Sequence, residues 1–153
     1  MTWIKPSFLW MMHRSGWATK PGQERVLAIE ITRAGFEWAL SHAALSHYDP
    51  SVHPSHDEWV ARMKTSSVRV QWDPERSLLL QALPWRSIQI GLSGGAVNRY
   101  LNQWITAVTD VTPLARRVHD YADSGHLDAA QTELPAEQVY PLPDALRANL
   151  GAT

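Results

Sequence analysis

A stretch of alternating apolar and polar residues in the middle of the chain limits the choice of fold more than any other pattern. Residues 68–72 read VRVQW, and a two-residue period of this kind indicates a strand with one buried face. Residues 73–76 (DPER) predict a turn, because proline favours the second position of a β-turn. A return strand over 78–82 would complete a hairpin, and another strand is expected over 88–92, where apolar residues again alternate with polar ones.

Helical patterns flank this β region on both sides. Pro6 can occupy the first turn of a helix, and Thr32 and Ser55 are suitable N-caps for two others. The expected helices cover residues 7–14, 33–45, 55–64, 97–105 and 113–124, with a short one up to 134, a last turn around 146–150 and a further strand over 25–31. Consecutive strands joined by tight turns predict an α+β fold, a small, mostly antiparallel sheet packed by several helices.

Length and composition favour one domain. A chain of 153 residues is long enough to bury a real core, and we expect a single domain over residues 1–153. The absence of cysteine excludes disulfides and thiolate chemistry. No apolar run approaches the roughly 20 residues that a bilayer requires, and the run from Phe8 to Met12 is too short for a signal peptide. These features predict a cytoplasmic protein.

The charge is distributed in alternating blocks, although the net charge is only -1. Residues 1–36 and 62–109 are basic, and residues 37–61 and 110–153 are acidic. Two basic blocks that converge in space would attract an anion. Tryptophans near these cations could stack on a base. The candidate ligand-binding cations are Lys5, Arg14, Lys20, Arg25, Arg69 and Arg86.

The segment from Gly91 to Gly95 (GLSGG) carries two further candidates, Ser93 and Gly94. It matches the nucleophile elbow of hydrolases, but the upstream strands read as a hairpin rather than as the parallel βα units that this fold needs. Ser93 is better explained as a helix N-cap. The backbone N–H groups at such a helix start can bind a phosphate.

A histidine-rich loop and a high tryptophan content suggest other functions. His42, His47, His53 and His56 fall within fifteen residues of each other. They could serve a metal-dependent enzyme, although their spacing matches no common zinc pattern. The chain has eight tryptophans. Those that remain exposed could mark a protein contact or a homo-oligomer.

Four segments resemble a known family. They are residues 2–17, which include TWIKPSFLWMM and RSGW, and the segments KPGQERVLAI (20–29), VRVQWDPERS (68–77) and RSIQIGLS (86–93). Together they resemble domain of unknown function 4291, a family of mainly bacterial proteins. The resemblance implies no established activity and therefore no catalytic residues.

Members of that family begin with a further segment upstream of the TWIKPSF string, whereas here Met1 directly precedes it. We expect that such a shortened chain would lack part of its sheet, exposing an edge. We also expect it to be less stable than an extended form.

Taken together, these patterns favour a domain that binds or acts on a phosphate-bearing ligand, either a nucleotide or a nucleic acid. The alternatives are a non-enzymatic interaction or homodimer domain, and a metal-dependent enzyme using the loop from His42 to His56. Neither a cofactor nor a reaction follows from the sequence.

Overall fold

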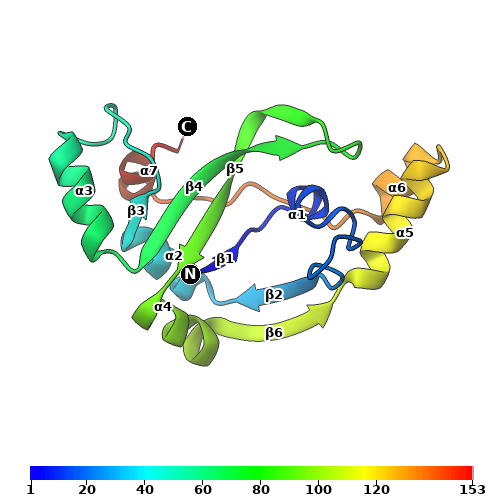
Figure 1. Ribbon diagram of the computed structural model, residues 1–153, viewed down its shortest axis with the longest axis horizontal. Helices are drawn as coiled ribbons and strands as arrows, with labels where there is room; N and C mark the ends of the chain where they lie inside the picture. Colours follow the sequence, from blue (N-terminus) through cyan, green and yellow to red (C-terminus); the bar gives the residue numbers. More distant parts are fainter. Residues whose placement is uncertain (153) are drawn as a thin grey trace.

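The computed structural model describes residues 1–152, and its strands form two separate sheets (Figure 1). Strands β1 (Thr2–Ile4), β3 (Ala43–Leu45), β4 (Val68–Arg76) and β5 (Ala82–Leu92) form one sheet in the order β1-β5-β4-β3. Strands β2 (Leu27–Ile31) and β6 (Ile105–Asp110) form an antiparallel ribbon. In the larger sheet β3 pairs parallel with β4, while β1–β5 and β4–β5 are antiparallel. The predicted α+β class is confirmed.

The helices lie mainly at the two ends of the molecule. Figure 1 shows α3 and α7 at one end, α5 and α6 at the other, and α1 between β4 and the β2–β6 ribbon. In the described residues the helices are α1 (Phe8–Ser15), α2 (Arg33–Ser41), α3 (His56–Thr65), α4 (Gly94–Arg99), α5 (Thr112–Asp123), α6 (Leu127–Glu133) and α7 (Asp144–Leu150), and a π-helical segment η1 (Tyr100–Trp104) follows α4.

Several helices begin where their capping residues predict. The Ser7 hydroxyl accepts a hydrogen bond from the Trp10 N–H at 3.1 Å, and Thr32 and Ser55 cap α2 and α3 in the same way. Gly16 ends α1 in the left-handed conformation, with φ of 59°, which glycine adopts without steric cost. The expected helices near residues 7–14, 55–64 and 113–124 are confirmed as α1, α3 and α5.

Two apolar clusters stabilise the fold. The larger one packs α2, η1 and α7 against the face of the sheet that carries Val68, Val70, Ile90 and Leu92. The smaller one joins α1, α5 and α6 around Met12. The β2–β6 ribbon connects the clusters, because the residues at its ends pack into one cluster or the other. Its middle is exposed on both strands.

The turn predicted at residues 73–76 is wrong. Strand β4 continues to Arg76, and the reversal lies at residues 77–81, where Leu80 has φ of 60° and its N–H donates to the Ser77 carbonyl at 2.8 Å. Pro74 is tolerated because β3 pairs with β4 only from Val68 to Val70, so β4 has a free edge at the proline. The strand expected over 88–92 is confirmed as the end of β5, which begins earlier, at Ala82; the return strand expected over 78–82 is wrong, because residues 78–81 lie in the turn.

Two predicted helices extend too far toward the C-terminus. The helix expected over 33–45 ends at Ser41, and residues 43–45 instead pair with β4 as β3. The helix expected over 97–105 ends at Trp104, and Ile105 begins β6, a strand that was not predicted. Strand β1 was also missed. In each case pairing with a distant strand outweighs local helical periodicity. No helix among residues 1–152 is long and apolar enough to span a membrane.

Candidate functional site

Lys5, the first predicted ligand cation, is already bonded within the protein. Its Nζ donates to Asp73 Oδ2 at 3.1 Å and to the Ser87 carbonyl at 3.1 Å, and it lies 4.4 Å from the Trp10 ring centroid. Burial lowers the pKa of Lys5, while the hydrogen bond and the charge of Asp73 act in the opposite direction. The ammonium therefore connects the segment after β1 to the large sheet.

The other predicted cations of the N-terminal block lie near the surface, and their charged groups do not gather at one place. Arg14 is exposed at the end of α1, and the Lys20 ammonium donates to the His13 and Arg14 carbonyls, so it caps that helix. Arg25 forms an ion pair with Asp110 at 2.9 Å. Arg86, from the second basic block, is exposed on β5. These four side chains do not form one site.

Arg69, Ser93 and Gly94 do lie close together, near the end of α3. The Arg69 guanidinium donates to the carbonyls of Met63, Ser66 and Val68. The Ser93 N–H and hydroxyl both donate to the Ser67 carbonyl, at 2.9 and 3.1 Å. Ser93 occupies the N-cap position of α4, but its side chain makes no capping bond, so that part of the prediction is wrong.

A groove of about 520 Å³ lies beside these residues. It is lined by His42, Ala61, Arg62, Thr65, Ser66 and Ser67. None of these lining residues is acidic, and several carry hydrogen-bond donors. We call it the His42–Arg62 groove.

Two side chains of the groove, Arg62 and Ser67, keep donors available. Arg62 donates through Nε to the Ala43 carbonyl at 3.0 Å, and among residues 1–152 its two terminal nitrogens have no partner. His42 Nδ1 lies 2.8 Å from the Trp38 carbonyl. A carbonyl only accepts, so Nδ1 carries a proton, and in the neutral imidazole Nε2 is then an acceptor rather than a donor. The Ser67 hydroxyl makes no hydrogen bond within the described chain, whereas the Thr65 and Ser66 hydroxyls bond to backbone carbonyls.

The surroundings of the groove act on its electrostatic potential in both directions. The carbonyls at the end of α3 are the negative end of the helix dipole, and Arg69 satisfies the carbonyls of Met63 and Ser66. His42 stacks on Trp38 with a centroid distance of 3.9 Å, and the Arg99 guanidinium lies 4.8 Å from the same indole. The groove therefore offers the Arg62 guanidinium and the Ser67 hydroxyl to an anion.

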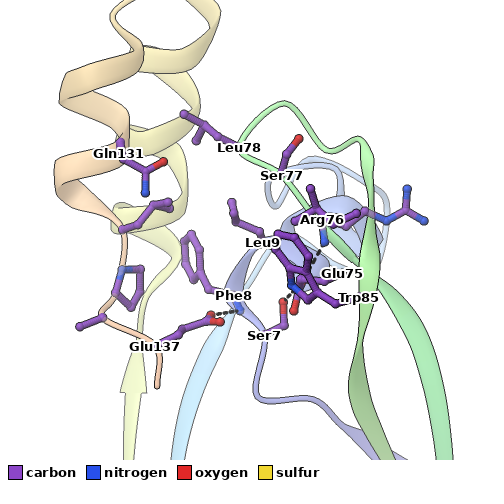
Figure 2. Close-up of a pocket in the computed structure, with 14 residues that line it drawn as sticks. Ser7, Phe8, Leu9, Glu75, Arg76, Ser77, Leu78, Trp85, Gln131 and Glu137 are labelled. Carbon is purple, nitrogen blue, oxygen red and sulfur yellow. Dashed lines mark hydrogen bonds between the residues drawn. The ribbon is translucent and has the colours of Figure 1, made fainter. Parts of the chain in front are cut away.

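A second cavity, of about 650 Å³, lies at the opposite end of β4, between the β4–β5 hairpin, the start of α1 and the segment after α6 (Figure 2). Its polar groups include Ser7, Glu75 and Glu137. Glu75 Oε1 accepts from the Ser7 hydroxyl at 2.6 Å and from the Arg76 N–H at 2.7 Å. Glu137 Oε1 accepts from the Phe8 N–H at 2.8 Å. We call it the Glu75–Glu137 cavity.

The two carboxyl groups have different environments. Desolvation raises the pKa of Glu137, the hydrogen bond from the Phe8 N–H lowers it, and the negative charge of Glu75 raises it, with a net upward shift. Much of the Glu137 residue is exposed, but its carboxyl group points toward the start of α1 (Figure 2). The protein therefore disfavours the ionised form of Glu137.

The histidine loop does not form a metal centre. His53 Nδ1 bonds to the backbone of Asp49, His47 lies beside Ser46, and His56 packs against Trp59. Within the described part of the chain, no three His, Asp or Glu side chains gather where they could hold a metal ion. The loop thus gives a metal-dependent reaction no structural support.

The tryptophans range from buried to exposed. Trp17 is buried and stacks on His119 with a centroid distance of 5.3 Å. Trp3 and Trp85 are exposed. Trp3 packs over Gly91, where a Cβ atom would lie 2.9 Å from the indole. Trp85 lines the Glu75–Glu137 cavity.

The sequence missed the groups that the structure brings together. Arg62 was counted only as part of a basic block, and Glu75 and Glu137 are 62 positions apart in the sequence. One local signal does exist for Arg62, because it lies in the last turn of a predicted helix and is followed closely by Ser66 and Ser67. For Glu137, in a segment interrupted by prolines, the sequence carries no comparable signal.

Comparison with known proteins gives one result. The family model described as "Domain of unknown function (DUF4291)" matches residues 1–140, so the chain belongs to that family. No curated protein and no solved structure matches the chain.

Proposed function

We propose that this DUF4291 member binds a phosphate-bearing ligand in the His42–Arg62 groove. One observation carries the proposal: the terminal nitrogens of Arg62 have no partner within residues 1–152 and lie in a groove whose lining has no carboxylate. A guanidinium donates two parallel hydrogen bonds to a phosphate, which makes arginine well suited to this ligand. The Ser67 hydroxyl can supply a further donor.

The dimensions of the groove suit a nucleotide or a segment of nucleic acid. A volume of about 520 Å³ lies within the roughly 300–1,000 Å³ of small-molecule sites. The groove is open, so a chain of nucleotides could also lie along it. The two ligand classes differ in their salt dependence, because a polyanion releases counterions when it binds.

The test is calorimetric titration of the protein with each of three probes: pyrophosphate, ADP and a short single-stranded RNA. The informative variants are Arg62→Gln and Arg62→Lys. The first removes both the positive charge and the paired N–H donors of the guanidinium, and the second keeps only the positive charge. Hydrogen bonds to charged groups contribute about 1.5–3 kcal/mol, so Arg62→Gln should weaken binding by about tenfold or more. Arg62→Lys should recover only part of that loss.

Arg14→Gln is the matched control, because Arg14 is an exposed arginine on α1 and outside the groove. It should bind each probe as the unaltered protein does. Equal weakening by Arg14→Gln and Arg62→Gln would mean that only general charge attracts the probes, and the proposal would fail. If the affinity for RNA did not change with salt concentration, a nucleic acid would be excluded as the ligand.

The β2–β6 ribbon favours a second candidate function, an interaction or homodimer domain. Leu27 is 51% exposed and Val108 is 55% exposed, and both lie on the same face of the ribbon as Ile29. Exposed apolar side chains next to one another are typical of protein contacts. Sedimentation analysis over a range of concentrations tests this candidate, which predicts a dimer that Val108→Asp dissociates. A monomer at every concentration would exclude a homodimer.

A further inference from the structure

The Glu75–Glu137 cavity is a second candidate binding site, separate from the phosphate groove. We propose that it binds an organic cation, a primary ammonium group carried on an apolar or aromatic body. The proposal goes beyond the phosphate-binding function and does not depend on it, since the two sites lie at opposite ends of β4 and share no lining residue.

The cavity has the size and walls of a small-molecule site. Its volume of about 650 Å³ is in the range that holds compounds of drug size. Its walls are largely apolar and include Phe8, Leu78, Leu83, Trp85 and Leu134. The Trp85 side chain is 59% exposed at the end of β5, so an aromatic surface is available to a ligand. Aromatic rings also attract cations through their electron-rich faces.

The carboxylates of the cavity are not neutralised by the protein. In the described residues neither Glu75 nor Glu137 forms an ion pair, and their hydrogen-bond donors are a hydroxyl and backbone N–H groups. The Arg76 backbone lines the cavity, but its guanidinium is directed away from both carboxylates and donates to the Leu80 carbonyl (Figure 2). Lys5 acts on Glu75 only at longer range, because its ammonium is bonded to Asp73.

An uncompensated pair of carboxylates determines the charge of the ligand. Figure 2 shows Glu75 and Glu137 on either side of the segment from Ser7 to Phe8. Their mutual repulsion raises the pKa of Glu137, after the larger effect of desolvation. An ammonium group in the cavity would offset this repulsion, because a nearby positive charge favours the ionised form of both carboxyl groups. An anionic ligand would increase the repulsion, so phosphate does not suit this cavity.

Each carboxylate keeps an oxygen for the ligand. The bonds within the protein use Oε1 of Glu75 and Oε1 of Glu137, and the Oε2 atoms have no partner among residues 1–152. An ammonium group has three donors, so it can bond to the free Oε2 atom of one carboxylate while the charge of the other attracts it. The apolar body of the ligand would then lie against Trp85 and Leu78.

The test compares three compounds with the same body and different charge: 2-phenylethylamine, 2-phenylethanol and 3-phenylpropionate. Each is titrated into the intact chain by calorimetry and by NMR. The expected result is that only the amine binds with measurable affinity, and that Glu75→Gln and Glu137→Gln each weaken it by at least tenfold. A short peptide of alanines with one central lysine, titrated in the same way, would show whether a lysine side chain binds with the affinity of the free amine.

The control variant is Glu133→Gln, on α6 near the cavity but bonded to Arg117 and absent from the lining. It should bind the amine as the unaltered protein does. Circular dichroism and the melting temperature establish that each variant is folded. Trp85→Ala should also weaken binding of the amine, although it removes no charge. The proposal is overturned if the alcohol binds as tightly as the amine, or if the two glutamine variants bind the amine unchanged. Pyrophosphate binding by these variants should not change, which separates this site from the groove.

Discussion

Lys5 and Asp73 form an ion pair of 3.1 Å in which the Lys5 side chain is only 1% exposed. The pair joins the segment between β1 and α1 to the middle of β4, across 68 positions of sequence. Gln71 Nε2 also donates to Asp73, at 2.7 Å. The charges are therefore matched within a small network on the face of the sheet opposite the larger apolar cluster.

Removing one member of this pair should be costly. Asp73→Ala leaves the Lys5 ammonium buried with only carbonyl partners, and an uncompensated buried charge typically costs about 3–5 kcal/mol. Replacing both residues, as Lys5→Met with Asp73→Ala, should recover much of that loss. Urea denaturation measures both effects. Arg25→Ala, which removes an exposed ion pair with Asp110, should change the free energy of unfolding far less. An equal change would show that the buried pair of Lys5 and Asp73 stabilises the fold no more than an exposed pair does.

Gly35 is fixed by its contact with Trp104. A Cβ atom at this position would lie 2.3 Å from Cγ of the buried indole, so Gly35→Ala should force α2 and η1 apart. Overpacking of this kind typically costs about 1–3 kcal/mol. Gly95→Ala is the matched control, because a Cβ atom there meets nothing within 4 Å. It should leave stability unchanged or raise it. Thermal unfolding of the two variants provides the comparison, and equal melting temperatures would contradict the packing account.

Glu137 should give the stability a specific pH dependence. Desolvation raises its pKa above the ordinary 4.5, so the folded protein binds this proton more tightly than the unfolded chain does. Stability then falls as pH rises from about 4.5 through the folded pKa. Glu137→Gln does not titrate and lacks this loss. Relative to that variant, the unaltered protein should be more stable at about pH 4 than at about pH 7, as measured by urea denaturation. A difference that is constant or grows with pH would refute the assignment.

Local sequence signals predicted much of the fold. Thr32 and Ser55 start helices as their capping chemistry predicts, and the alternation at residues 68–72 correctly marks β4. Pro6, expected in the first turn of α1, instead precedes its N-cap Ser7. The errors arise where distant pairing decides the conformation. Residues 43–45 continue a helical pattern, but they add a parallel strand to β4. Pro74 reads as a turn residue, yet it lies at a free edge of the sheet.

The candidate sites were less predictable than the fold. Charge blocks identify where cations are numerous, but they do not show which of them are already bonded. Lys5 and Arg69 are engaged with Asp73 and with helix carbonyls, respectively, whereas the terminal nitrogens of Arg62 are available in the part of the chain that the structure describes. That difference depends on side-chain geometry, which periodicity and composition do not encode.

The most direct test of phosphate binding is NMR of the isotope-labelled chain titrated with ADP. The account predicts progressive amide shifts centred on Arg62, Ser66 and Ser67, with the Glu75 and Glu137 amides unchanged, and loss of those shifts in Arg62→Gln. Shifts centred on the Glu75–Glu137 cavity, or no shifts at millimolar ADP in the folded protein, would contradict the proposal.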